Sequence, residues 1–273
     1  MNLHPFDQAL QLTSAEPHVF TGASARPYWN MVGPFGGMTA ATALNAVLQH
    51  PALLGEPIAL TVNYAGPVAA GPFKVSATPA RTNRSTQHWV ISLSQTNAEG
   101  ADEVMLTGTA VTAARRSTWS HNDEAMPQVP GPAELPVGKS VRVLEWLNRY
   151  EMRFVQGNIP VEWHGGGETS LSQLWVRDNP PRPLDFCSLA ALADVFFPRV
   201  YLRRAVLVPA GTVSMTVYFH ANSEQLTQSG SGFLLAQARA QAFSDGFFDQ
   251  TAQLWNESGA LLATSHQIVY FKE

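Results

Sequence analysis

Residues 188–198 read SLAALADVFFP, and the interpretation of the whole chain depends on this stretch. Its large apolar residues recur at spacings of three and four, at Leu189, Leu192, Val195 and Phe196. This pattern predicts a short helix with one buried face, which ends just before Pro198 because proline cannot continue a helix. Asp194 would then lie in the last turn, where the helix dipole disfavours a carboxylate by roughly 0.3–1 kcal/mol. Considered locally, Asp194 is either a solvated surface carboxylate or a functional group.

The composition is that of a globular protein. A length of 273 residues allows one large domain or two of ordinary size. Hydrophobic residues make up 45% of the chain and charged residues 14%, the latter well below the usual share of about 25%. Much surface should therefore be buried, and we expect a homodimer or a higher homo-oligomer. The net charge of -4 argues against a nucleic-acid-binding scaffold, which would present a basic face.

The single cysteine and the absence of long apolar runs bear on the cellular compartment. Cys187 cannot form an internal disulfide, and its position at an apolar helix predicts a buried thiol. The chain contains no run of 18 apolar residues, and the first ten residues lack the layout of a signal peptide. We expect a soluble, cytoplasmic protein with no membrane-spanning segment.

The first half reads as a helix followed by a meander of strands. Gly36 and Gly37 open a stretch with helical spacing that should end before Pro51. The free amides at this helix start suit an anion or a carbonyl oxygen, although a tight turn that requires glycine explains the pair equally well. Alternation of apolar and polar residues then predicts strands over residues 58–64, 74–81, 87–95 and 104–112.

The second half repeats the first after a proline-rich linker over residues 115–140. The apolar positions of residues 213–219 repeat those of residues 58–64 at an offset of about 155. Further strands are predicted over residues 233–243, 248–255 and 261–271. Two copies of one α+β unit are the simplest account, with an N-terminal unit over 1–114, the linker over 115–140 and a C-terminal unit over 141–273.

Several chemical motifs are incomplete. His164–Gly167 reads HGGG, as in esterase oxyanion loops, but the chain has no G-x-S-x-G nucleophile elbow. The eight histidines show no zinc-ligand spacing, so we predict no metal. Residues 177–180 read RDNP and partly match the D-x-N-P-x-H signature of hot-dog hydratases. The residue between Asp and Asn is missing, and Arg182 occupies the histidine position.

The duplicated unit resembles a double hot-dog fold, in which each of two tandem units wraps an antiparallel sheet around a central helix. Over residues 10–272 the chain resembles the acyl-CoA thioesterase II family. In the first half the likeness rests on Phe35-Gly36-Gly37 and on residues 65–67, which read AGP where the family has an Arg-Pro step. The second half contains three residues in the family's order: Asp194 shortly before a proline, Thr212 eight residues before His220, and Gln267 in the last strand.

This resemblance implies an acyl-CoA thioesterase that needs no cofactor. Asp194 would act as general base on a water held by Thr212 and Gln267, and the Gly36 or Gly37 amide would polarise the thioester oxygen. The sequence departs from the family at residues 213–215, which read VSM in place of the usual Ile-Asp-His, and at Met38, where glutamine is common.

Strand alternation creates a difficulty for this site. It places Thr212 on the face opposite the apolar residues, so a bulge would be required to turn it inward. Two alternatives stay open. One is a hot-dog protein that binds an acyl ligand without turnover, and the other, disfavoured by the incomplete signature at Asp178, is a hot-dog hydratase.

Overall fold

The chain folds as two successive sets of helices and strands, and the structure, a computed structural model, describes residues 3–138 and 144–273. The N-terminal set comprises α1 (Pro5–Ala9), β1 (Thr13–Glu16), β2 (Val19–Ala23), η1 (Arg26–Tyr28), α2 (Gly36–Leu48), β3 (Glu56–Tyr64), β4 (Pro72–Thr82), β5 (Thr86–Thr96) and β6 (Asp102–Ala113). The connection contains η2 (Pro132–Glu134). The C-terminal set comprises η3 (Glu145–Arg149), β7 (Tyr150–Gln156), β8 (Ser172–Asp178), α3 (Phe186–Leu192), α4 (Arg199–Arg203), β9 (Ala210–Phe219), α5 (Ser223–Ser229), β10 (Leu234–Arg239), β11 (Phe243–Ser244), β12 (Phe247–Asn256) and β13 (Leu261–Phe271).

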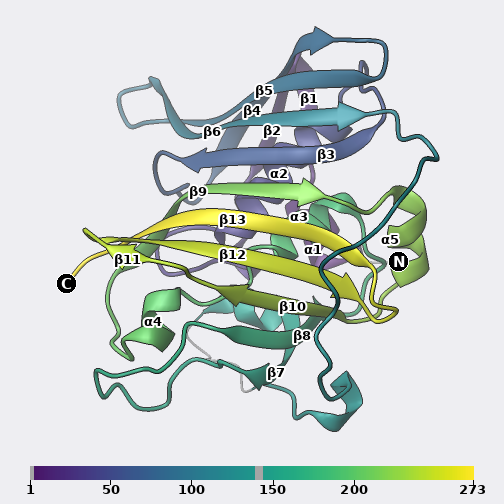
Figure 1. Cartoon of the computed structure of the whole chain (residues 1–273). Helices are drawn as coiled ribbons and strands as arrows, with labels where there is room; N and C mark the ends of the chain where they lie inside the picture. Colours follow the sequence, from purple (N-terminus) through teal and green to yellow (C-terminus); the bar gives the residue numbers. More distant parts are fainter. Residues whose placement is uncertain (1–2, 139–143) are drawn as a thin grey trace.

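All strands join one antiparallel sheet that curves around the two central helices (Figure 1). Of the 13 strands in the described residues, twelve follow the order β1-β2-β4-β5-β6-β3-β9-β13-β12-β10-β8-β7, and the thirteenth, β11, pairs with β12. The first set therefore forms one side of the sheet and the second set the other, and α2 and α3 lie behind both sides in the view of Figure 1. This is the α+β arrangement expected of two tandem hot-dog units.

The two halves meet in a symmetric pairing of β3 with β9. Thr61 pairs with Thr216 and their hydroxyl oxygens lie 3.0 Å apart, at a sequence separation of 155 residues. On either side of this pair, Ala59 faces Tyr218 and Asn63 faces Ser214. Residues of β3 and β9 that lie 155 apart in the sequence are thus related by a local two-fold axis. This relation explains the offset of about 155 residues seen in the sequence.

Helix α2 begins at Gly36 and ends at Leu48, before Pro51 as predicted, and nearly all of its residues are buried. Its many alanines allow the sheet and α3 to approach closely. A Cβ on Gly37 would lie 2.6 Å from the carbonyl oxygen of Ala191 in α3, so no side chain fits at this contact. No side chain caps the first turn of α2, and its free amides are available to groups from other elements.

Helix α3 differs from the prediction over residues 188–198. It begins two residues earlier, at Phe186, where the side chain of Asp185 accepts a hydrogen bond from the Ser188 N–H at 2.8 Å. It also ends earlier, because the Asp194 N–H bonds to Ala191 in a tighter turn. Asp194 therefore lies just beyond the helix and not in its last turn. The nearby thiol of Cys187 is buried, as predicted, and burial raises its pKa.

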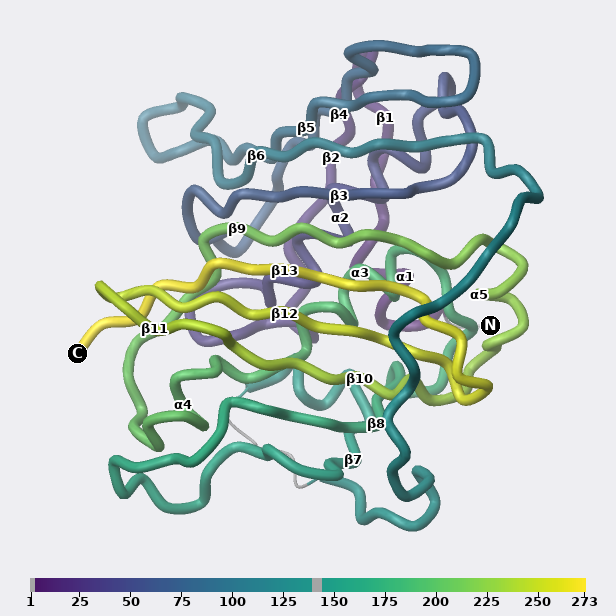
Figure 2. Tube along the Cα trace, in the orientation of Figure 1, coloured from purple at the N-terminus to yellow at the C-terminus, as the bar shows by residue number. Residues whose placement is uncertain are grey.

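The linker crosses the outer face of the C-terminal half (Figure 2). The indole N–H of Trp175 in β8 donates to the Pro130 carbonyl at 2.8 Å, and linker side chains Met126, Val129 and Leu135 pack on the outer aromatic cluster that contains Trp175. Residues 139–140 of the predicted linker and 141–143 of the predicted C-terminal unit lie outside the described residues. The division at residues 114 and 140 stays a prediction. Among the described helices, none is both long and apolar enough to cross a membrane.

Arg115 ties the two halves together at the end of β6. Its guanidinium donates to the carbonyls of Pro57 (2.9 Å) and Phe219 (2.8 Å), on the two central strands, and to His220 (3.3 Å). The Nε atom also lies 3.2 Å from a carboxylate oxygen of Glu56. One side chain thus bridges β3 and β9.

We expect Arg115→Ala to lower the free energy of unfolding by about 1–3 kcal/mol, because several charge-assisted hydrogen bonds are lost together. The neighbouring exposed Arg116 offers a matched control, and Arg116→Ala should stay within about 0.5 kcal/mol of the parent. Urea denaturation of both variants measures the difference. Equal stabilities would contradict a bridging role for Arg115.

Candidate active site

The Asp194 carboxylate lies where the end of α3 meets the start of α2. The residue is 8% exposed. The Gly37 N–H donates a hydrogen bond to the carboxylate, and a Cβ built on Gly36 would lie 2.8 Å from its Oδ2 atom. The first turn of α2, supplied by the N-terminal half, therefore holds a carboxylate supplied by the C-terminal half.

Gln267 and Thr212 complete a hydrogen-bonded row with Asp194. The Gln267 side-chain amide in β13 donates to Asp194 Oδ1 at 2.8 Å. The Thr212 hydroxyl in β9 donates to the Gln267 Oε1 atom at 3.2 Å. The structure thus brings together the three side chains selected from the sequence, from three separate elements.

A β-bulge in β9 turns Thr212 toward this row. Ile268 pairs with Ser214, but the next residue, Val269, pairs with Thr212, so Val213 is the extra residue of the bulge. Without the bulge, alternation from the buried Met215 would place Val213 inside and Thr212 outside. The shift in register resolves the conflict between the strand pattern and the expected position of Thr212.

Burial raises the pKa of Asp194 from its ordinary value of 3.8 to about 7. The hydrogen bonds from Gln267 and from the Gly37 N–H act in the opposite direction and favour the carboxylate. From the sequence, a position at a helix terminus beside a second helix predicts a raised pKa for Asp194; the direction agrees, but the cause does not. The neighbouring helix start stabilises the charge, and loss of solvent is what raises the pKa.

The amides of Gly36 and Gly37 have different roles in the structure. The Gly37 N–H is used by Asp194, whereas for Gly36 we find no hydrogen bond from its N–H to any described residue. The Gly36 carbonyl accepts a hydrogen bond from the Tyr64 hydroxyl at 2.9 Å. This bond fixes the orientation of the Gly36–Gly37 peptide group, which carries the Gly37 N–H. Burial, and then Asp194, raises the pKa of Tyr64 well above its usual value, so this donor stays protonated.

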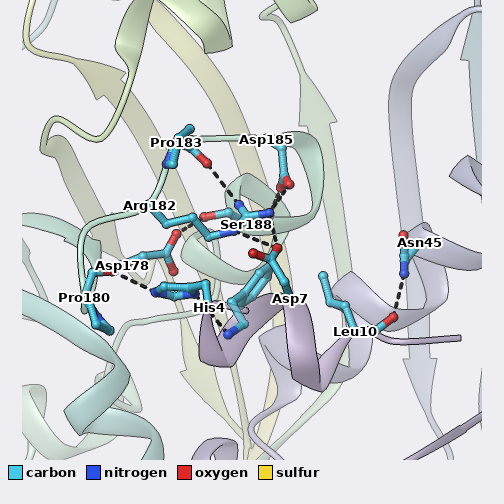
Figure 3. Close-up of polar contacts among 11 residues, drawn as sticks. His4, Asp7, Leu10, Asn45, Asp178, Pro180, Arg182, Pro183, Asp185 and Ser188 are labelled. Carbon is cyan, nitrogen blue, oxygen red and sulfur yellow. Dashed lines mark hydrogen bonds and ion pairs between the residues drawn. The ribbon is translucent and has the colours of Figure 1, made fainter. Parts of the chain in front are cut away.

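A charged cluster anchors the other end of α3 (Figure 3). The Arg182 guanidinium contacts Asp7 of α1 at 2.6 Å and the helix cap Asp185 at 2.5 Å. The Ser188 hydroxyl donates to Asp178 at 2.5 Å. These contacts fix where α3 begins, and therefore where Asp194 lies at its far end.

Asp178, the aspartate of the incomplete hydratase signature, is a buried carboxyl whose pKa burial raises to about 6. The histidine that approaches this loop in Figure 3 is His4. Its Nε2 atom lies 2.8 Å from the Pro180 carbonyl, and its Nδ1 atom accepts the Phe6 N–H at 3.0 Å. Both ring nitrogens bond to backbone atoms, and within the described residues neither is hydrogen bonded to Asp178.

Aromatic rings that no sequence pattern predicted cover the first turn of α2. The Phe35 ring stacks on Trp146 of η3 at 4.3 Å and meets Tyr150 edge-on at 6.0 Å. The aromatic residues themselves were visible in the sequence, but they show no periodicity that would link them to α2. Within the described residues, no group of three His, Cys, Asp or Glu side chains is placed to hold a metal ion.

The fold and the site define a double hot-dog protein with one buried carboxylate between its two central helices. The chain belongs to the acyl-CoA thioesterase family: the model of the family's N-terminal domain matches residues 25–113, and that of its C-terminal domain matches residues 123–271. None of the curated proteins compared with the sequence matches it.

Solved structures agree on the fold. A conserved protein of unknown function with a hot-dog fold from Alicyclobacillus acidocaldarius shares 45% identity over 100% of this chain and 99% of its own, with a TM-score of 0.92. A proposed thioesterase II from Thermobifida fusca YX is 20% identical over 98% and 97% of the two chains, with a TM-score of 0.82. An acyl-CoA thioesterase II from Mycobacterium marinum is 18% identical over 98% of each chain, with a TM-score of 0.77. At such identities the last two bear on the fold alone.

We expect Asp194→Asn to stabilise the protein above pH 7. Between about pH 4 and 7 the folded state retains a proton on Asp194 that the unfolded chain releases, so this group lowers stability as pH rises through that window. Removing it should raise the free energy of unfolding at pH 8 by about 1–3 kcal/mol, with a smaller gain at pH 5.

Urea denaturation at both pH values measures this gain. Asp123→Asn, at a fully exposed carboxylate, is the control and should change stability by less than about 0.5 kcal/mol. An Asp194→Asn protein less stable than the parent at pH 8 would contradict the raised pKa.

Proposed function

We propose that the protein hydrolyses acyl-CoA thioesters to a free acid and CoA, using one water activated by Asp194. The observation that supports this most directly is the buried Asp194 carboxylate, with a pKa near 7, hydrogen bonded to Gln267 beside the start of α2. A base with a pKa near the working pH is both ionised and basic enough to take a proton.

In this mechanism Asp194 accepts a proton from water while the water oxygen attacks the thioester carbonyl carbon. Thr212 and Gln267 position the water, since their side chains form one row with the base. The negative charge that develops on the carbonyl oxygen is stabilised at the start of α2. Because Gly37 bonds to Asp194, the Gly36 N–H is our candidate for that donor. Collapse of the intermediate breaks the C–S bond, and the proton on Asp194 passes to the departing thiolate.

One active site per chain follows from the asymmetry of the two helices. The segment that ends α3 supplies a carboxylate, but α2 contains no acidic residue. The opposite end of α3 carries the Arg182 cluster, which makes internal contacts. The cytoplasmic location, the homodimer or higher homo-oligomer and the lack of a nucleic-acid partner stay predictions.

The main alternative is a hot-dog protein that binds acyl-CoA without turnover. The same row of polar side chains could line a ligand pocket without activating a water. The hydratase alternative is weakened further by His4, whose ring nitrogens both bond to backbone atoms. Catalysis and binding are separated by measuring release of free CoA thiol from short, medium, long and aromatic acyl-CoAs. No release above background from any of them would contradict the thioesterase proposal.

We expect Asp194→Asn to lower kcat by about 10²–10⁴ with little change in KM, because general-base catalysis is lost while the pocket keeps its shape. The matched control is Asp178→Asn, which alters the second buried carboxyl near α3 and should leave kcat within a factor of about three. A hydratase would release no thiol from the parent or from either variant, since it adds water to a double bond and leaves the thioester intact. Thiol release under saturating substrate measures both.

The value of kcat/KM should rise with pH through a midpoint near 7, since only the ionised Asp194 can accept the proton of water. The same midpoint should appear in Asp178→Asn and be absent from the residual activity of Asp194→Asn. Initial rates between pH 5.5 and 8.5, at constant ionic strength, test this. A parent profile that is flat across this range would exclude Asp194 as the base.

A further inference from the structure

Tyr64 ends strand β3 with its side chain on the inner face of the sheet. Leu60 and Val62 are fully buried, and strand alternation places Tyr64 on the same face. Its ring packs against the core, and its hydroxyl donates to the Gly36 carbonyl at 2.9 Å. A side chain from the sheet therefore contacts the first turn of α2, beside the candidate base.

The peptide group that Tyr64 contacts is the one that holds Asp194. The Gly36 carbonyl and the Gly37 N–H belong to a single trans peptide group, in which they point in opposite directions. The carbonyl accepts the Tyr64 hydroxyl, and the N–H donates to the Asp194 carboxylate. A donor on the carbonyl and an acceptor on the N–H polarise the group in the same sense, so each hydrogen bond strengthens the other.

The Tyr64 hydroxyl and the carboxylate lie beside the same backbone atom. A Cβ built on Gly36 would be 2.8 Å from Asp194 Oδ2 and 3.4 Å from the Tyr64 hydroxyl oxygen. A tyrosine hydroxyl has one proton, and Tyr64 gives it to the Gly36 carbonyl. Any effect of Tyr64 on Asp194 through a hydrogen bond must therefore pass through the Gly36–Gly37 peptide group.

The titratable groups around Asp194 are uncharged at neutral pH. Asp194 raises the pKa of Tyr64 in β3 and of Tyr150 in β7, and both stay protonated. Helix α2 has no titratable side chain, and the Cys187 thiol of α3 has a raised pKa. Among the described residues, the groups that shift the pKa of Asp194, apart from burial, are Gln267 and the Gly37 N–H. A change in the Gly37 bond should therefore appear directly in the titration of Asp194.

The two-fold related position in the other half has no hydroxyl. Position 219 in β9 lies 155 residues after position 64, and it is phenylalanine. The Phe219 ring packs edge-on against Phe186, the first residue of α3, at 5.7 Å. Each of the two strands thus ends against the start of a helix. The hydroxyl occurs at the end where the helix start receives a carboxylate.

We propose that Tyr64 is a positioning residue for Asp194: its hydroxyl holds and polarises the Gly36–Gly37 peptide group, so that the Gly37 N–H stays directed at the carboxylate. The inference rests on the proposed thioesterase function, in which Asp194 is the base, and adds a residue that acts through the backbone. Because the Gly37 bond favours the carboxylate, loss of the Tyr64 hydroxyl should raise the pKa of Asp194 further.

The Tyr64→Phe variant removes one oxygen and keeps the ring. We expect the midpoint of kcat/KM against pH to rise by about 0.3–1 pH unit. At pH 6 the variant should be about two- to tenfold less active than the parent. At pH 9 the two should differ less than twofold, since Asp194 is then ionised in both. A purely structural role would lower kcat/KM by the same factor at every pH and leave the midpoint in place.

Tyr201→Phe is the matched control, because the Tyr201 hydroxyl also donates to a backbone carbonyl at 2.9 Å, that of Val208. Its midpoint should equal that of the parent. Thermal melting of both variants shows that they are folded before rates are compared. An unchanged midpoint in Tyr64→Phe, or the same shift in both variants, would overturn the role of Tyr64.

A measurement that does not need activity separates this inference from the proposed function. Carbon-13 NMR of protein labelled at the aspartate carboxyl groups follows each titration, and Asp194→Asn identifies the Asp194 signal. Its midpoint should rise in Tyr64→Phe by the same 0.3–1 pH unit.

A parent that releases thiol and loses this activity in Asp194→Asn, with the same Asp194 titration in Tyr64→Phe, refutes only the positioning role. A parent that releases no thiol from any acyl-CoA refutes the catalytic proposal. The NMR titration still decides on Tyr64 in that case, because an unshifted Asp194 signal contradicts its contact through the peptide group.

Discussion

The contact between the Asp194 carboxylate and the first turn of α2 is the interaction on which the site depends. Removing a carboxylate from water is costly, and the Gly37 amide and the Gln267 side chain offset only part of that cost. The balance leaves the pKa near 7, where a carboxyl group can both hold and release a proton. Because the amide comes from one half of the chain and the carboxylate from the other, neither half contains this site by itself.

The two glycines at the start of α2 allow this contact for steric reasons. A Cβ at Gly36 would lie 2.8 Å from the carboxylate, and one at Gly37 would lie 2.6 Å from the backbone of α3. The pair therefore permits close approach on two sides, and it leaves the first amides of the helix free of a side-chain cap. A tight turn alone, the other explanation considered from the sequence, does not account for both contacts.

The two halves are related by symmetry in the sheet, but the charged residues around the two central helices do not follow that symmetry. The pairing of β3 with β9 about Thr61 and Thr216 keeps the two-fold relation. Around the helices that relation is lost, since Asp194 lies at one end of α3 and the Arg182 and Asp178 contacts lie at the other. The charged cluster fixes one end of α3 and so sets the position of Asp194 at the other end. The linker covers the outer face of β8, which makes this strand buried on both faces.

Periodicity in the sequence by itself predicted the helix and the order of the central strands in each half, because periodicity is a local property, and the resemblance to the family selected Asp194, Thr212 and Gln267. Periodicity missed β8, whose two buried faces remove the alternation that marks a strand. Three features were decided only by tertiary structure. Burial between two helices set the pKa of Asp194, and a register shift against β13 turned Thr212 inward. Packing of Trp146 in η3 and of Tyr150 on Phe35 placed aromatic rings beside the first turn of α2. All three depend on contacts between residues far apart in the chain, which no local pattern records.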